Sequence, residues 1–291
     1  METMDSTGGA HPAADGRLTC TLCPHACRLR TGETGFCRAR WNDGGVIRAK
    51  NYGRLTALAL DPIEKKPLYH FYPGSCILSV GSFGCNLACP FCQNADIAMA
   101  NDQIETEYVA PARLAALAEE LRHQPRGNLG VAFTYNEPLI GIEYIMDTAP
   151  LLHAAGLAVV LVTNGMISAE PLMRLLPHVD AMNIDLKGWR ADFYRWLGGD
   201  LETVKTTIAR AAESGVHVEV TTLIIPDHND AAEDMDAEAR WLASLSPAIP
   251  LHISRYFPRH RLSTPPTPIT DIDRLTEIAR RHLRHVHRGN C

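Results

Sequence analysis

The chain has 291 residues, of which 46% are hydrophobic and 21% are charged, a composition typical of a globular protein with one large α/β core or two smaller ones. Its net charge of −5 gives no general attraction for nucleic acid or an anionic membrane, so neither is expected as a partner. The sequence has no run of 18 apolar residues, and its first residues lack the basic and apolar segments of a signal peptide. We therefore expect a cytoplasmic protein that acts on small molecules or on other proteins.

Nine cysteines are present. Disulfides are rare in a reducing cytoplasm, so clustered cysteines indicate metal binding or redox chemistry. Seven of the nine fall into two tight groups, which begin at Cys20 and at Cys85. The other two, Cys76 and Cys291, are interpreted as a small buried side chain or a loose terminal thiol.

Residues 1–16 are small and polar without periodicity, and we expect a disordered leader there. We expect residues 17–75 to form a cysteine-rich extension and a strap, and residues 76–291 to form the main domain. Glycine and proline between the cysteines of the extension predict a small, loop-rich knuckle around a metal. Four thiolates suit a structural Zn²⁺ and would equally suit an auxiliary [4Fe-4S] cluster; the ligands would be Cys20, Cys23, Cys27 and Cys37.

Two features lie between the cysteine groups. Apolar residues alternate around Asp43-Gly44-Gly45, which predicts a hairpin with its turn at these residues. The later segment DPIEKKPLYHF, residues 61–71, has two interpretations. It is either a charged turn over an aromatic patch, or a strap beside the second cysteine group in which Lys65 or Lys66 meets an anion.

From Cys76 onward, strand and helix patterns alternate. Short apolar runs rich in valine and isoleucine predict buried strands at 77–80, 129–134, 158–163, 179–184, 216–225 and 250–253. Amphipathic segments predict helices at 111–123, 139–155, 170–176, 201–214, 231–245 and 271–283. Six β/α units predict a parallel sheet that is either an open partial barrel or a doubly wound sheet. Both architectures place the ligand at the carboxyl ends of the strands, and polar residues follow nearly every predicted strand.

The segment after the first of these strands contains Cys85, Cys89 and Cys92 in a C-x3-C-x2-C pattern. Three thiolates so close together can hold three irons of a [4Fe-4S] cluster. The fourth iron then stays open for another ligand.

The segment CNLACPFCQN carries the radical SAM signature, and the chain resembles the AmmeMemoRadiSam system radical SAM enzymes, relatives of the pyruvate formate-lyase activating enzymes. The further matching segments are CPHAC, NYG, DPIEKKPLYHF, TYNEP, VTNG, DLKG, TLIIP and PLHISRYFP. The resemblance implies a partial (β/α)6 TIM-like barrel with a [4Fe-4S] cluster at the three cysteines. S-adenosylmethionine (SAM) would bind the open iron and be cleaved reductively to a 5′-deoxyadenosyl radical, which abstracts hydrogen from an unidentified small molecule or peptide.

The resemblance also implies roles for single residues. Phe91 would lie near the adenine, and Glu137 would hold the methionine ammonium. The ribose and carboxylate would meet Asn164, Asp185 and Lys187, and His252 would approach the same pocket from the sixth strand. For Glu137 and Lys187 a structural ion pair across the barrel mouth is the alternative.

The resemblance implies an electron donor such as flavodoxin or ferredoxin, and it allows for partner proteins of the same system. Two other functions stay open. The protein could be an activase that places a glycyl radical on a partner protein, or a non-catalytic iron-sulfur or zinc scaffold. The basic, histidine-rich end of the chain, RRHLRHVHRGNC, is interpreted as a solvated helix surface.

Overall fold

The structure is a computed structural model that describes residues 10–12 and 16–291. Most of the expected leader, residues 1–16, therefore lies outside the described residues. Within it, β1 (Ala10–Pro12) is a short strand that pairs antiparallel with β2 (Leu18–Cys20). These three residues differ from the expected disorder because β2 supplies them with hydrogen-bond partners.

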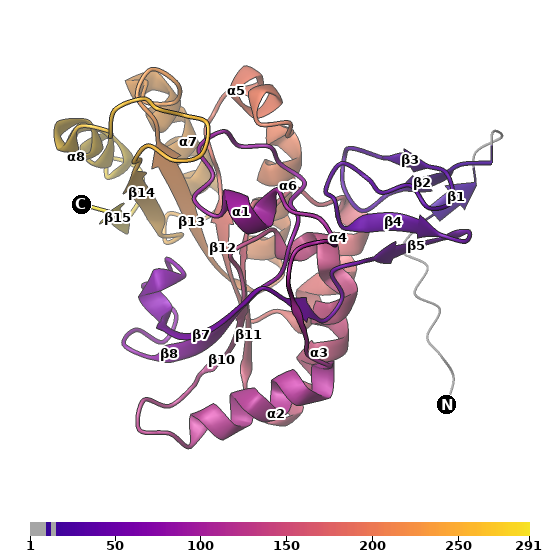
Figure 1. Ribbon diagram of the computed structural model, residues 1–291. Coiled ribbons are helices and arrows are strands. Elements are labelled where there is room, and N and C mark those ends of the chain that lie inside the picture. Colours follow the sequence, from indigo (N-terminus) through magenta and orange to yellow (C-terminus); the bar gives the residue numbers. More distant parts are fainter. Residues whose placement is uncertain (1–9, 13–15) are drawn as a thin grey trace.

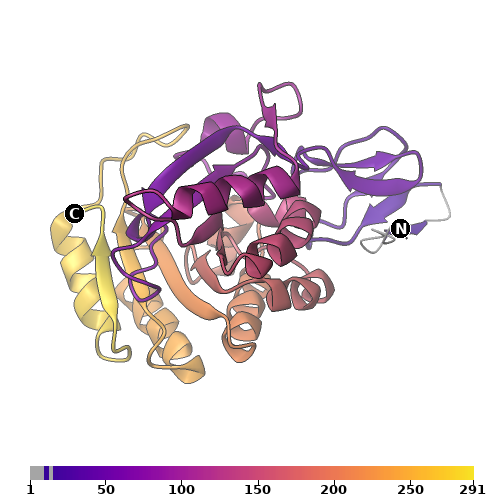
Figure 2. The same cartoon turned by 90° about the horizontal axis from the view of Figure 1, so that it is seen from below.

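The largest sheet in the described chain has eight strands, of which seven run parallel (Figure 1). In spatial order the parallel strands are β8 (Cys76–Gly81), β10 (Gly130–Phe133), β11 (Ala158–Thr163), β12 (Ala181–Asp185), β13 (His217–Ile224), β14 (Leu251–Arg255) and β15 (Val286–Gly289). At one edge β7 (Ala57–Pro62) runs antiparallel to β8. The sheet curves without closing (Figure 2).

Helices connect the parallel strands and cover the outer face of the curved sheet (Figure 2). They are α2 (Pro111–Arg122), α3 (Ile142–Ala154), α4 (Ala169–Leu175), α5 (Ala191–Trp196), α6 (Leu201–Glu213), α7 (Ala232–Leu245) and α8 (Ile269–Ala279). Shorter turns are α1 (Ala95–Ala98), η1 (Ile63–Lys65), η2 (Pro138–Gly141) and η3 (Leu176–His178). In the described part of the chain, no helix is both long and apolar enough to cross a membrane.

The predicted partial barrel is confirmed, and edge strands extend it at both sides. β7 was not predicted as part of this sheet. The chain end was interpreted as a helix surface, and this was wrong for residues 286–289, which form β15 beside β14. Val286 is buried, and its neighbours in sequence are partly exposed. This alternation is typical of a strand, in which successive side chains point to opposite faces of the sheet.

The strap enters the barrel. Ile63 and Leu68 are fully buried, and they pack inside the barrel against four small or branched side chains: Ile77, Ala132, Val160 and Ala181. We call Ile63 and Leu68 the plug. The plug fills the barrel between the antiparallel edge and the central strands, so the strap belongs to the hydrophobic core.

The charged residues of the strap surround Asp61. Lys66 Nζ lies 2.9 Å from Asp61 Oδ2, and Lys65 Nζ lies 3.2 Å from Asp61 Oδ1. The hydroxyl of Tyr135 donates to the same carboxylate at 2.7 Å. Burial opposes the charge of Asp61, but the bonds from Lys66 and Tyr135 keep its pKa well below the usual range. The anion that meets Lys66 is therefore one of the chain's own side chains.

The N-terminal extension lies to one side of the barrel (Figure 1). It contains β3 (Arg28–Leu29) and the predicted hairpin, which is formed by β4 (Arg40–Asp43) and β5 (Val46–Ala49). The short strands β6 (Arg54–Leu55) and β9 (Glu107–Tyr108) pair farther along. The guanidinium of Arg40 is buried and makes two bonds to the Glu143 carboxylate on α3, at 2.8 and 2.9 Å. This bidentate pair ties the extension to the barrel.

Leu68→Ala should lower the free energy of unfolding by about 2–5 kcal/mol, because removing a fully buried leucine side chain leaves a cavity. A urea titration followed by far-UV circular dichroism measures the loss. Leu58 on β7 is 45% exposed, and Leu58→Ala should change the same quantity by less than about 0.5 kcal/mol. Equal losses at the two positions would contradict the placement of the strap in the core.

Candidate active site

A cavity of about 350 Å³ lies at the carboxyl ends of the parallel strands. Its volume suits a small-molecule ligand. The structure places nearly all of the predicted site residues of the barrel on its wall: Cys85, Cys89, Phe91, Cys92, Glu137, Asn164, Asp185 and Lys187. The exception is His252. These side chains come from the end of β12 and from the segments that follow β8, β10, β11 and β12.

The three cysteines lie in the loop between β8 and α1. Cys85 Sγ accepts a hydrogen bond from the Leu87 N–H at 3.3 Å and another from Asn164 Nδ2 at 3.6 Å. Burial raises the pKa of Cys85 well above the usual value, raises that of Cys89 to about 11, and raises that of Cys92. Three thiols that resist ionisation need a cation before they can be thiolates. An iron-sulfur cluster supplies that positive charge, so the donor set fits one.

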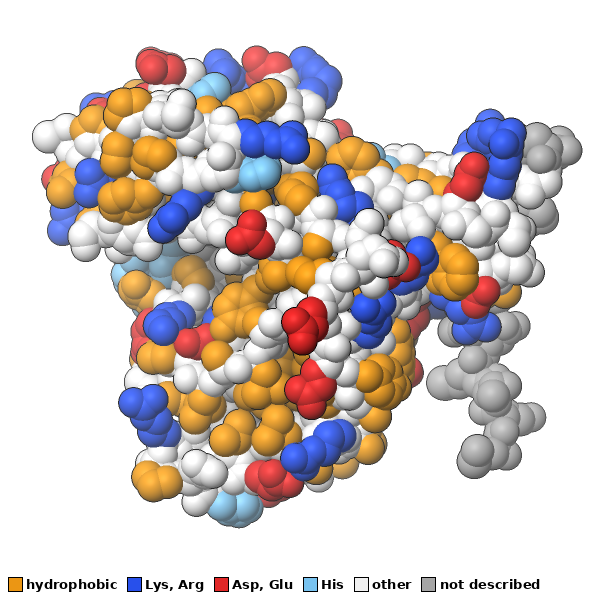
Figure 3. Space-filling view, viewed as in Figure 1, with side chains coloured by type: hydrophobic (Ala, Val, Ile, Leu, Met, Phe, Trp, Pro, Cys, Tyr) orange, Lys and Arg blue, Asp and Glu red, His pale blue; other side chains and the backbone are white. Residues whose placement is uncertain are grey.

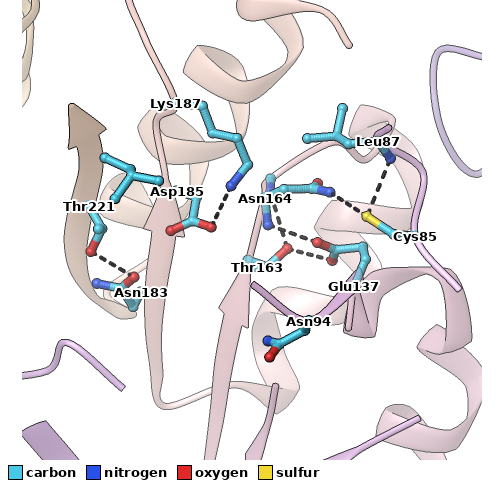
Figure 4. Close-up of polar contacts among 12 residues, drawn as sticks. Cys85, Leu87, Asn94, Glu137, Thr163, Asn164, Asn183, Asp185, Lys187 and Thr221 are labelled. Carbon is cyan, nitrogen blue, oxygen red and sulfur yellow. Dashed lines mark hydrogen bonds and ion pairs between the residues drawn. The ribbon is translucent and has the colours of Figure 1, made fainter. Parts of the chain in front are cut away.

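Glu137 connects the segments that follow β10 and β11. Its carboxylate accepts the Thr163 hydroxyl at 2.6 Å and the Asn164 N–H at 2.8 Å (Figure 4). It also accepts the Leu139 N–H at 3.0 Å. Burial raises the pKa of Glu137 to about 7, although these three bonds favour the charged form. The side chain therefore positions the Asn164 turn in addition to lining the cavity.

Asp185 and Lys187 form an ion pair on the opposite wall, with Lys187 Nζ 2.8 Å from Asp185 Oδ2 (Figure 4). Burial would lower the pKa of Lys187, but attraction to Asp185 and Cys89 raises it, so the ammonium stays charged. The Asn229 side chain donates to the Lys187 carbonyl at 2.7 Å and thereby fixes this segment to the turn after β13. The pair presents both charges to one cavity.

Phe91 gives the cavity an aromatic wall. The side chain is 3% exposed, and its ring centroid lies 6.5 Å from that of Phe193 and 6.1 Å from that of Trp196. Two neighbours from α5 therefore hold the ring in place. Such a surface suits a flat heterocycle.

His252 does not line the cavity, which departs from the prediction. Its Nε2 lies 2.6 Å from Glu219 Oε2, deeper in the barrel. Glu219 is fully buried and also bonds His217 and the N–H groups of Tyr69 and His70. Burial opposes its charge, but these donors lower the pKa of Glu219 to about 2. A buried carboxylate needs such donors, and this need turns His252 away from the cavity.

More histidines surround this carboxylate, and we call the group the histidine cluster: His70, His217, His252, His285 and His287. His70 Nε2 and His287 Nε2 lie 2.8 Å apart, and the rings of His70 and His285 have centroids 4.4 Å apart. The cluster joins the strap to β13, β14 and β15. It therefore closes the seam between the strap and the edge of the barrel.

The sequence reasoning missed several cavity residues. They include Thr221, Ser254 and Asn290, whereas Lys65 was predicted to lie beside the cysteines and does line this cavity. The alternation Val218-Glu219-Val220-Thr221 was a usable signal, because period-2 polarity places one polar face toward the barrel interior. Asn290 had no local signal, since it reaches the cavity only through the unexpected strand β15.

The four N-terminal cysteines lie together around a second, much smaller cavity, with Arg40 and Ile140. Cys27 Sγ accepts the Phe36 N–H at 3.5 Å, and Cys37 Sγ accepts the Arg40 N–H at 3.4 Å. Burial raises the pKa of Cys23 to about 12 and also raises that of Cys37. Metal-bound thiolates commonly accept hydrogen bonds from backbone N–H groups in this way.

Among the residues that the structure describes, no three His, Cys, Asp or Glu side chains are arranged to hold a metal ion. The four N-terminal cysteines nevertheless line one small cavity, and four thiolates suit either a zinc ion or an iron-sulfur cluster.

A partial β/α barrel with three cysteines at the carboxyl end of its first parallel strand defines a cluster-dependent α/β enzyme. Residues 79–242 match the sequence model of the radical SAM superfamily. This match spans more than half of the chain, and the chain belongs to the radical SAM superfamily. Its members cleave SAM at an iron-sulfur cluster to carry out radical chemistry, so both cofactors follow from the family.

Individual proteins resemble this chain in sequence or in fold. The chain is 40% identical over 281 residues to the uncharacterized protein MJ0808 of Methanocaldococcus jannaschii, covering 95% of this chain and 82% of that protein. A radical SAM methyltransferase from Sphaerobacter thermophilus has a similar fold, with a TM-score of 0.59 and 17% identity over 75% of this chain and 67% of that one. SuiB from Streptococcus suis, bound to S-adenosylmethionine, has a TM-score of 0.54 and 15% identity over 71% of this chain and 48% of that one.

The histidine cluster should make folding stability fall in mild acid. Burial, followed by the nearby His252 and His70, lowers the pKa of His287 to about 4. An unfolded chain takes up this proton near pH 6.5, so stability is lost as the pH falls from about 6.5 to about 4. In His287→Gln the free energy of unfolding should decline less steeply across this window. Urea titrations at several pH values measure both slopes. Identical slopes would contradict the assignment, since any acid lability of bound clusters affects both proteins alike.

Proposed function

We propose that this chain abstracts hydrogen from a small molecule or peptide, as an AmmeMemoRadiSam-type radical SAM enzyme related to the pyruvate formate-lyase activating enzymes. The observation that carries the proposal is the single cavity that joins Cys85, Cys89 and Cys92 to an acid, an amide and an ion pair. The bound cluster and SAM supply the chemistry, a reductive cleavage to methionine and a 5′-deoxyadenosyl radical. A scaffold without catalysis would need no such polar wall beside the cysteines.

The chain's own residues bind and orient the cofactor in this proposal. Lys187 offers a cation to the carboxylate of SAM, and Asp185 keeps that cation charged and fixed. Glu137 accepts two hydrogen bonds at Oε1 and one at Oε2, so Oε2 has one lone pair left for the ammonium of SAM. Asn164 contacts the Cys85 sulfur at 3.6 Å and faces the same space.

The apolar part of the wall has a separate task. Phe91 offers a ring face to the adenine, and Leu87 and Leu223 line the same cavity. Together they exclude water from the site of hydrogen transfer, which protects a reactive radical.

A second hollow of about 470 Å³ adjoins the cavity and gives the substrate a route to it. Gln93, Asn94 and Asn290 line both spaces, and Phe257 and Arg259 line only the outer one. The guanidinium of Arg259 suits an anionic group on the substrate.

Anaerobically reconstituted protein, reduced with dithionite and given SAM, should release 5′-deoxyadenosine and methionine in equal amounts. Chromatography with mass detection measures both products. The variant with Cys85→Ala, Cys89→Ala and Cys92→Ala should release neither, because the cluster ligands are gone. Absence of both products from wild-type protein with a full cluster would overturn the proposal. Appearance of a glycyl radical on an added partner protein would instead favour the activase function.

Lys187→Met should weaken SAM binding by roughly 10-fold or more, because it removes a half-buried cation from the carboxylate site. Equilibrium dialysis of the anaerobic, cluster-loaded protein with labelled SAM measures the dissociation constant. Lys205→Met is the matched control, since Lys205 pairs with Glu202 on the outer helix α6 at 2.8 Å and should leave binding unchanged. Equal affinity of Lys187→Met and wild-type protein would contradict the assigned role.

A further inference from the structure

We propose that the N-terminal cysteines hold an auxiliary iron-sulfur cluster that passes electrons to the cluster at Cys85, through Asn86 and Asn164. This inference rests on the proposed function, because it assigns the route by which the active site is reduced. It gives the extension a redox task beyond holding the N-terminus together.

The side chain of Asn86 links the two cysteine groups. On one side it lies near Cys23, where its influence lowers the pKa of that thiol against the larger effect of burial. On the other side its Oδ1 accepts a hydrogen bond from Asn164 Nδ2 at 2.9 Å, and the same Nδ2 lies 3.6 Å from Cys85 Sγ. Asn86 is 1% exposed. Two hydrogen bonds therefore connect the Cys85 sulfur through Asn164 to Asn86, and Asn86 lies beside the other cysteine group.

The backbones of the two cysteine groups are also in contact. A Cβ atom at Gly84, directly before Cys85, would lie 2.5 Å from the carbonyl oxygen of Cys37. Gly84 has a φ of +87°, so only glycine meets both demands without strain. His25 Nε2 lies 2.9 Å from the Asn86 carbonyl oxygen, so a residue beside Cys23 also touches the segment of the active-site cysteines.

The surroundings of the N-terminal cysteines favour a site that accepts an electron. The buried guanidinium of Arg40 interacts electrostatically with Cys20 and Cys37. Two backbone N–H groups point at Cys27 Sγ and Cys37 Sγ. Positive charge and hydrogen bonds at cluster sulfurs stabilise the reduced state and raise the reduction potential.

The extension also carries charge that suits an acidic electron donor. Residues 17–50 contain seven arginines and lysines but only two acidic residues, although the whole chain has a net charge of −5. Basic side chains lie over the extension at the right of Figure 3. Such a surface attracts an acidic one-electron donor of the ferredoxin or flavodoxin class.

The electron balance is simple. The donor protein is oxidised by one electron, and the N-terminal cluster gains that electron and then loses it to the cluster at Cys85. No bond forms or breaks and no proton moves in this step. The active-site cluster is thereby reduced by one electron, as cleavage of SAM requires.

The first test counts metal in the variant Cys85→Ala, Cys89→Ala, Cys92→Ala, which keeps only the N-terminal group. Anaerobically reconstituted protein should contain about four irons per chain. After reduction with dithionite it should show the electron paramagnetic resonance signal of one reduced cluster. Zinc without iron, or iron that dithionite and the stronger reductant titanium(III) citrate both leave unreduced, would overturn the proposal.

The second test measures transfer in protein with both clusters. Freeze-quenched samples give the rate at which the cluster at Cys85 is reduced, once with reduced ferredoxin and once with dithionite. In Asn86→Leu the ratio of the ferredoxin rate to the dithionite rate should fall by roughly 10-fold or more, because the link between the sulfurs is lost. Asn86→Ala serves the same purpose if the leucine does not fit.

The matched control is Asn128→Leu. Asn128 is a buried asparagine whose side chain bonds Leu78 N and the Ala118 carbonyl oxygen, and it has no contact with either cysteine group. In Asn128→Leu the ratio of the ferredoxin rate to the dithionite rate should equal that of wild-type protein. An unchanged ratio in both Asn86 variants would overturn the relay. Failure of the proposed function is a separate result, because dithionite-reduced wild-type protein would then form no 5′-deoxyadenosine.

Discussion

The buried carboxylate of Glu137 is the constraint on which the active-site end of the barrel depends. It accepts hydrogen bonds from the Leu139 N–H, the Thr163 hydroxyl and the Asn164 N–H, and so fixes the ends of two neighbouring strands to each other. Asn164 then reaches both Cys85 and Asn86. A buried carboxylate without these donors would be costly, so its bonds also determine where the turn can lie. The cysteine loop, the cofactor wall and the link to the N-terminal extension all meet at this side chain.

Most of the barrel could be predicted from the sequence, because buried parallel strands are continuous apolar runs and helices have their own period. The predicted strand at 158–163 agrees with β11 residue for residue. β15 was missed because its four residues include His287 and Arg288, which read as polar surface when β14 is not known to lie beside them. An edge strand is defined by its neighbour and only weakly by its own composition.

The sequence predicted those site residues that lie at or just after the end of a strand. The structure brings four of them together at one cavity: Glu137, Asn164, Asp185 and Lys187. His252 lies within a strand, where its direction depends on the pairing of β14 with β13 and on the unmet needs of Glu219. The position of the strap could not be predicted either, because contacts with distant strands place Ile63 and Leu68 inside the barrel. Local pattern carries information about neighbours in sequence, and these contacts join residues far apart in the chain.

The plug has a consequence for where ligands can lie. Ile63 and Leu68 fill the barrel between the antiparallel edge and the central strands, so that part of the interior has no room for a ligand. The cysteines line the cavity at the strand ends, and Phe257 and Arg259 line the hollow that adjoins it. Gln93, Asn94 and Asn290 line both spaces. Occupants of the two spaces would therefore be neighbours across a shared wall, rather than ligands stacked along the barrel axis.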